Sequence, residues 1–176
     1  MIGELRKKLK SQGDISSYYS LSDFMNEVYQ QVGHNLYIRS GINLSTSGCT
    51  ALTVLIRGKH IVCSNVGDSR AVIGYIRKGI PYPLQLSVEH TTNVQSEVER
   101  IRSNGGRICP CLSKHGDEGP PRVWLKNIWT PGLTKTRTFG DLVASTIGVN
   151  SDPQILTHKV KREDRFLIIA SHAIWE

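Results

Sequence analysis

The sequence of 176 residues lacks long apolar runs, and its four cysteines are too few for a dense disulfide framework. No apolar stretch approaches the roughly 20 residues that a membrane-spanning helix needs. The basic start of the chain is not followed by the apolar region of a secretory signal, and the sparse cysteines argue against a small secreted domain. We therefore expect an intracellular protein, cytoplasmic or nuclear, that does not enter a membrane.

Aromatic residues are also scarce, at 7% of the chain, whereas the net charge is +7. A basic protein suits an acidic or phosphorylated partner. Binding of single-stranded nucleic acid would also need aromatic side chains interleaved with the cations to stack bases, and the sequence has no such pattern. We expect a solvated basic surface and a phosphoprotein substrate or protein partner, with no specific nucleic acid.

Two of the cysteines lie close together and raise the question of a metal. Cys109 and Cys111 flank a proline, and His115 follows. A closed zinc site takes four ligands, usually in two spaced pairs, and the sequence offers no second pair. Free thiols are the better interpretation.

Three strands joined by tight turns are predicted in the segment Ser47–Ile76. Residues 50–57 are apolar on both alternating faces, which predicts an interior strand buried on two sides. Residues 60–66 form the returning strand, and Gly67 permits the turn before residues 71–76. Asp68 lies in that second turn, where an acidic side chain is presented to a cleft.

The rest of the chain mixes helices with antiparallel strands, which predicts the α+β class. Apolar residues at intervals of three and four predict helices over 21–36, 94–101 and 139–147, the first capped by Ser20 or Ser22 and the second by Asn93. Alternation or apolar runs predict strands over 82–87, 107–112, 154–160 and 166–170. Glycine, proline and charge over 113–121 predict a mobile loop.

Four segments carry a resemblance to a known family. They are Ser47–Ala51 (SGCTA), Asn65–Ala71 (NVGDSRA), Arg122–Asp141 (RVWL, PGL and TRTFGD) and Phe166–Glu176 (FLIIASHAIWE). In this order they resemble the SG(S/T)TA, NVGDSRA, RVWL…PGLAMSRSFGD and FLILASDGLWD segments of the metal-dependent protein serine/threonine phosphatases of type 2C. The resemblance covers nearly the whole chain from about Phe24 onward. Four ordered segments are far more specific than one tetrapeptide.

The resemblance implies two antiparallel sheets packed as a sandwich, with helices on the outer faces. It also implies a pair of Mg²⁺ or Mn²⁺ ions whose water attacks the phosphorus of a phosphoserine or phosphothreonine. We expect residues 1–20 to form a poorly defined N-terminal segment and residues 21–176 a partial phosphatase-like domain, incomplete at both ends.

The sequence departs from the family in its metal ligands. The Asp-Gly-His-Gly segment that should precede Phe24 is missing, and so is the Asp-Asn pair of a later strand. His172 stands at the position of the family's bridging aspartate, beside Ala173 in place of glycine. Asp68, at an accessory metal position, is the family carboxylate that remains. One carboxylate binds a hard divalent ion weakly, so we expect little metal binding and no intact catalytic set.

Other residues of the matched segments are expected to support the structure around the site. They are Gly67, Ser69, Arg70, Arg137, Gly140 and Asp141. We expect Arg137 and Asp141 to form an ion pair that holds a turn. Asp68 is expected to stabilise its own turn beside Arg70.

The sequence therefore predicts a relative of the type 2C phosphatases that is catalytically impaired or inactive. Two alternatives stay open: a pseudophosphatase that binds a partner, and a non-functional fragment of a larger phosphatase. Strands missing from both ends would leave unpaired sheet edges, through which the chain would self-associate.

Overall fold

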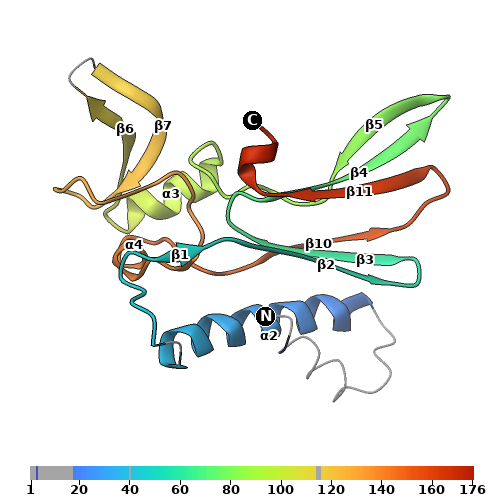
Figure 1. Cartoon of the computed structure of the whole chain (residues 1–176), viewed down its shortest axis with the longest axis horizontal. Coiled ribbons are helices and arrows are strands. Elements are labelled where there is room, and N and C mark those ends of the chain that lie inside the picture. Colours follow the sequence, from blue (N-terminus) through green and yellow to red (C-terminus); the bar gives the residue numbers. More distant parts are fainter. Residues whose placement is uncertain (1–2, 4–17, 40, 114–115) are drawn as a thin grey trace.

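The computed structural model describes residues 3, 18–39, 41–113 and 116–176 (Figure 1). The predicted N-terminal segment 1–20 lies largely outside this part of the chain. Runs of antiparallel strands are separated by single helices, and the α+β class is confirmed. In the described residues, no helix is long and apolar enough to span a membrane.

Two three-stranded antiparallel sheets form the sandwich. The first has the order β10-β3-β2 and the second the order β11-β4-β5. Their bounds are β2 Ala51–Arg57, β3 His60–Val66, β4 Arg70–Arg77, β5 Ile80–Gln85, β10 Gln154–Lys159 and β11 Asp164–Ala170. Apolar side chains of both sheets meet in one cluster, which includes Cys63 of β3 and Ile73 of β4. The sandwich thus follows from strands whose apolar faces must be buried against each other.

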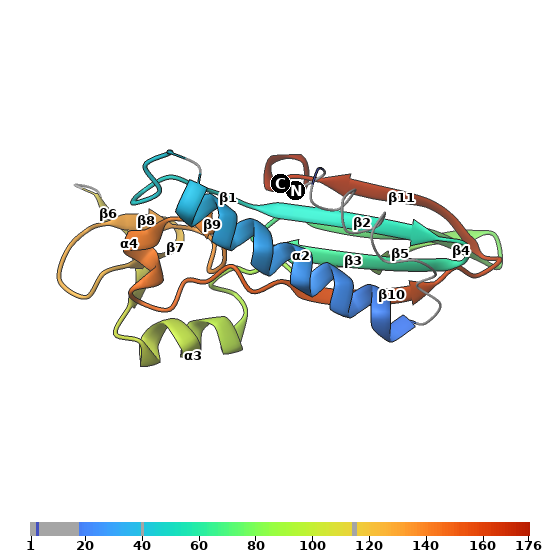
Figure 2. The same ribbon diagram turned by 90° about the horizontal axis from the view of Figure 1, so that it is seen from below.

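Helix α2, Tyr18–Arg39, lies along the outer face of the first sheet (Figure 2). Its apolar stripe packs against Val62 and Val66 of β3, with Phe24, Val28 and Tyr29 at the centre. The Tyr29 hydroxyl donates to the carbonyl oxygen of Ser64 at 2.7 Å, so its polar atom is satisfied in the core. In the described residues no helix covers the outer face of the second sheet, where Phe166 and Ile168 are exposed.

A smaller unit stands beside the sandwich. It contains the sheet β6-β7-β8 and two helices around a separate apolar cluster of Ile101, Val123, Ala144, Ile147 and Val149. The bounds are α3 Gln95–Ser103, β6 Arg107–Ser113, β7 Gly116–Trp124, β8 Pro131–Leu133 and α4 Leu142–Ser145. The short strands β1 Gly48–Cys49 and β9 Phe139–Gly140 pair with each other and tie this unit to the start of β2.

The structure corrects the expected place of the buried strand. Residues 51–57 form β2 at the end of the described sheet, and their side chains are half-buried or exposed. The central strand is β3, which is buried over Ile61–Val66. Apolar alternation identified both strands, but the late strand β10 pairs with β3, at Gln154 opposite Asn65, and so decides which is interior.

Several predicted boundaries were also wrong. Helix α2 begins at Tyr18, before both proposed caps. Helix α3 has Val94 at its N-cap, with no side-chain hydrogen bond there. The helix expected over 139–147 shrinks to α4, preceded by β9. Residues 116–121 belong to strand β7, because backbone pairing to β6 outweighs their glycine and proline content.

Candidate functional site

The turn that carries Asp68 is held by its neighbours on both sides. Gly67 has φ +108°, and a Cβ there would lie 2.2 Å from the Thr50 side chain, so the position requires glycine. The Gly67 N–H donates to His90 Nδ1 at 3.1 Å, and Asn65 Nδ2 donates to the Gly67 carbonyl at 3.0 Å. The preserved segment therefore fixes the backbone of the turn, while the Asp68 side chain stays half-exposed.

His172 is brought to the same end of the second sheet. Ala170, the last residue of β11, pairs with Arg70, the first residue of β4. The short 3₁₀ helix η1, His172–Ile174, follows immediately. His172 Nε2 lies 2.8 Å from Glu176 Oε1, with the two side chains 42% and 71% exposed. Asp68 and His172 thus adjoin one sheet end, but His172 is engaged within its own turn.

Arg70, beside the Asp68 turn, pairs with a different carboxylate. Its guanidinium forms an ion pair with Glu89 and lies over the Trp175 ring, 5.2 Å from the centroid. Trp175 in turn donates its indole N–H to the Ala170 carbonyl at 3.1 Å. The Thr50 and Ser69 hydroxyls lie 3.2 Å apart. Arg70 and Ser69 therefore brace the strands around the turn, and the Asp68 carboxylate is not part of that bracing.

These residues do not fit a two-metal centre. Across the described residues, no group of three His, Cys, Asp or Glu side chains is placed to hold a metal ion. A hard divalent ion needs several oxygen ligands, whereas this sheet end offers one family carboxylate beside an imidazole. The same limit applies to the zinc question, since Cys109 and Cys111 are free, and His115 lies outside the described residues.

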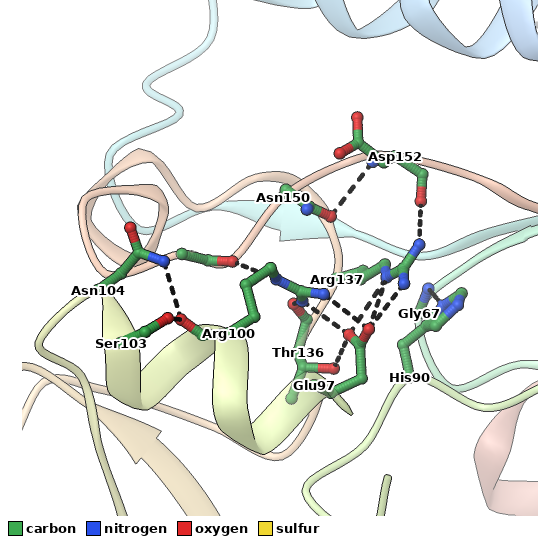
Figure 3. A network of polar contacts seen from close by, with 11 residues as sticks. Gly67, His90, Glu97, Arg100, Ser103, Asn104, Thr136, Arg137, Asn150 and Asp152 are labelled. Atoms are coloured by element: carbon green, nitrogen blue, oxygen red, sulfur yellow. Dashed lines mark hydrogen bonds and ion pairs between the residues drawn. The ribbon is translucent and has the colours of Figure 1, made fainter. Parts of the chain in front are cut away.

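A network of charged and polar side chains surrounds Glu97 of α3 (Figure 3). This carboxylate is 1% exposed. Arg100 donates to its two oxygens at 2.6 and 2.7 Å, Arg137 at 2.6 Å, and the Thr136 hydroxyl at 2.6 Å. Burial raises the pKa of Glu97, but these donors outweigh it and hold the pKa well below its usual range. We call Glu97, Arg100, Thr136 and Arg137 the Glu97 cluster.

The Glu97 cluster joins segments that are distant in the sequence. Arg100 Nε donates to the Gly148 carbonyl and Arg137 Nη1 to the Asp152 carbonyl, each at 2.8 Å. The Thr136 N–H donates to the His90 carbonyl at 2.8 Å. His90 is buried, and this desolvation, followed by the charge of Arg137, lowers its pKa to about 4. Through His90 the cluster reaches the Gly67 turn (Figure 3).

The expected Arg137–Asp141 ion pair was wrong, because Arg137 binds Glu97 instead. Asp141 is buried at φ +49°, and its Oδ2 has no hydrogen-bond partner in the described part of the chain. Gly140 has φ +80°, and a Cβ there would lie 2.2 Å from the Ser47 carbonyl oxygen. Gly140 thus permits the close contact between β1 and β9.

Glu97 was missed as a site residue although the sequence carried a signal for it. It lies on the same helical face as Val94 and Ile101, where a charged residue is unusual unless it is paired. Its partners Thr136 and Arg137 follow about 40 residues later, so the spacing could not reveal them.

One cleft lies away from the Asp68 turn. It has a volume of about 390 Å³ and is lined by residues that include Tyr75, His158 and Asp164, where β4 ends and β11 begins. His158 Nε2 lies 2.7 Å from Asp164 Oδ2. This cleft does not include the Asp68 turn, which lies before the start of β4. A second cleft of about 360 Å³ is lined by Thr138, Phe139 and Gly140 of the matched segment.

Comparison with known proteins identifies the fold and the family. The family profile of Protein phosphatase 2C matches residues 2–176. Probable protein phosphatase 2C 41 of Arabidopsis thaliana is 36% identical over 172 residues, covering 96% of this chain and 48% of that protein. Probable protein phosphatase 2C 73 of Oryza sativa subsp. japonica is 34% identical, covering 89% of this chain and 40% of that protein.

Solved structures show the same fold at low identity. The serine-threonine phosphatase 2C of Toxoplasma gondii superposes with a TM-score of 0.77 at 19% identity, over 89% of this chain and 52% of that one. A C. elegans sex determining protein gives 0.75 at 20% identity, over 98% and 38%. The chain belongs to the protein phosphatase 2C family. It spans about half the length of the curated relatives it matches.

Proposed function

We propose that this chain provides the scaffold of a metal-dependent protein serine/threonine phosphatase domain, and that residues 1–176 alone are catalytically impaired or inactive. The observation that carries the proposal is the sheet end beside the Asp68 turn. It presents Asp68 next to the segment in which His172 replaces the family aspartate and contacts Glu176. A phosphoprotein is the proposed substrate of the complete activity, with Mg²⁺ or Mn²⁺ as the metal.

The physical reason is charge. Two divalent ions and a metal-bound water require several carboxylates held at fixed positions. A neutral imidazole supplies no negative charge to offset a dication, and His172 already has a partner. Asp68 by itself leaves any bound ion coordinated mainly by water.

The direct test is phosphate release from a phosphothreonine peptide in the presence of Mn²⁺ or Mg²⁺. We expect no release above the protein-free blank from residues 1–176. Asp68→Ala is the informative variant, and Asp23→Ala, an exposed aspartate on α2, is its matched control. Turnover that Asp68→Ala abolishes and Asp23→Ala preserves would overturn the proposal.

Metal binding can be measured separately by isothermal titration with MnCl₂. We expect a Kd weaker than about 1 mM, near the limit of a useful interaction. His172→Asp restores the family carboxylate and should tighten binding without reaching turnover. A tight two-site isotherm from the unmodified chain would show that its residues do form a metal centre.

A second candidate is a pseudophosphatase that binds a partner without catalysis. The excess of cations, at +7, favours this function over a purely structural one. A sharp, cooperative thermal unfolding of a monomer would support such a module. Concentration-dependent assembly would instead support self-association through strand β11, whose Phe166, Ile168 and Ile169 are exposed.

A further inference from the structure

A solvent-exposed aromatic surface lies on the loop between β7 and β8, in the unit that stands apart from the sandwich (Figure 1). The Leu125 N–H donates to the Thr130 carbonyl at 2.8 Å and closes the loop. At its tip, Ile128 and Trp129 are 53% and 49% exposed. Exposing large apolar side chains to water is unfavourable, and neighbouring exposed apolar side chains are typical of an interaction surface.

The Trp129 ring is held in a defined position. It meets the buried ring of Trp124 edge to face, with centroids 5.0 Å apart. Trp124 is itself fixed, because its indole N–H donates to the Cys109 carbonyl at 2.9 Å. Gly132 makes room for it, since a Cβ there would lie 2.7 Å from the Trp124 ring. An exposed aromatic side chain that is already ordered loses little conformational entropy on binding.

Arg107 of β6 lies over the Trp129 ring, with its guanidinium carbon 4.2 Å from the ring centroid. Its Nε and Nη2 atoms are buried and have no hydrogen-bond partner within the described ranges. Lys126 is exposed on the same loop. Within those ranges, neither cation has a carboxylate partner.

The absence of a carboxylate partner in the described residues distinguishes Arg107 from the arginines near the Asp68 turn. Arg70 pairs with Glu89, and Arg137 pairs with Glu97. Arg107 is half-buried, and its charge has no carboxylate to balance it in the described residues. An anion gains by approaching the part of the guanidinium that solvent reaches, beyond the buried Nε and Nη2 atoms. The two free cations and the adjoining apolar side chains therefore complement a segment that carries both acidic and apolar residues.

We propose that Arg107, Lys126, Ile128 and Trp129 form a docking surface for an acidic peptide segment of a protein partner. An apolar side chain of the peptide packs on Trp129 and Ile128, and a carboxylate lies against Arg107. A carboxylate is favoured over a phosphate dianion, because a phosphate calls for several converging donors and two of the Arg107 donors are buried. The inference does not depend on catalysis.

The test measures fluorescence anisotropy of a labelled peptide in which Glu and Asp flank Leu and Phe. We expect saturable binding by the full chain and about a tenfold weaker Kd for Arg107→Gln and for Trp129→Ala, the loss of roughly one charged or aromatic contact. Arg165→Gln, which removes an exposed arginine on β11, is the matched control and should change the Kd less than twofold. Circular dichroism verifies that each variant is folded.

Three further probes decide between ligands. They are the same peptide with Lys in place of its acidic residues, a phosphoserine version of it and a single-stranded oligonucleotide. The lysine peptide should not bind, and the phosphoserine version should bind no better than the acidic one. No saturable binding of the acidic peptide below about 1 mM, equal binding by the variants, or an Arg107-dependent preference for phosphopeptide or oligonucleotide would each overturn the proposal. Phosphate release by the chain would contradict the proposed function and leave this measurement valid.

Discussion

The Glu97 cluster and the sheet end with Asp68 and His172 are connected through His90, yet they are built in opposite ways. Glu97 is buried and takes hydrogen bonds from two arginines and a threonine. Asp68 is half-exposed. The His172 side chain is 42% exposed, and it contacts Glu176, which is more exposed still. In the first region buried charges are paired with each other, and in the second the charged and polar side chains are exposed to solvent.

This difference in burial indicates which polar residues stabilise the fold. A buried carboxylate destabilises a domain unless every oxygen is matched, so the Glu97 cluster must stay intact for the domain to fold. An exposed carboxylate is solvated whether or not it has a partner. The sheet end can therefore change its residues at little cost in stability, and any need for Asp68 comes from function.

The largest expected effect comes from Glu97→Ala. It leaves Arg100 and Arg137 without their carboxylate in a largely buried place, and we expect the free energy of unfolding to fall by about 3 kcal/mol or more. Urea denaturation measures it. Glu99→Ala removes an exposed glutamate of the same helix and should cost less than about 0.5 kcal/mol. Equal losses for the two variants would mean that the cluster does not hold the domain together.

The second-largest expected effect is a loss of folding stability at low pH, caused by His90 and Glu97. The pKa of His90 falls from 6.5 to about 4 on folding, so the unfolded chain binds the proton more tightly. Stability is complete above pH 6.5 and is lost as the pH falls toward 4, by up to about 3 kcal/mol. The pKa of Glu97 is also lowered by folding. Glu97 therefore adds a further loss of stability as the pH falls below the ordinary pKa of a glutamate. Arg137 and Arg100 face His90 and stay charged throughout.

Urea denaturation at pH 7, 5.5 and 4.5 follows this change. His90→Asn should flatten the profile between pH 6.5 and 4, whereas His34→Asn, an exposed histidine of α2, should leave it unchanged. A wild-type profile that is flat over this range would show that His90 titrates freely in the folded chain.

The smallest expected effect belongs to Asp68→Ala. Among the residues that the structure describes, the Asp68 side chain makes no hydrogen bond that holds the turn, which is fixed by Gly67, Asn65 and His90. The free energy of unfolding should change by less than about 0.5 kcal/mol. A loss above about 2 kcal/mol would show that the carboxylate supports the fold and would remove the contrast between the two regions.

Much of the fold was predictable because it is local in the sequence. Alternation or apolar runs predicted β3, β4, β10 and β11 to within a few residues. The loop expected over 113–121 was wrong because pairing with β6 is a contact that composition does not report. The helix over 139–147 was wrong because Phe139 and Gly140 pair with β1, about 90 residues earlier.

The contacts of the candidate site were not predictable from the sequence. The matched segments marked Asp68, His172, Arg70, Arg137 and Asp141 as candidates, and their role in a site stays a prediction. Their partners differ from those expected. Arg137 was assigned to Asp141, four residues away, but in the fold it reaches Glu97 of another element.

The sequence by itself determined the family and most strands of the sandwich, because these depend on residue type and short-range pattern. The tertiary structure alone decided which strand is central and that Arg137 joins Arg100 in neutralising Glu97. Those outcomes depend on segments up to about 90 residues apart meeting in space. A buried charge is matched by whichever partner the fold brings to it.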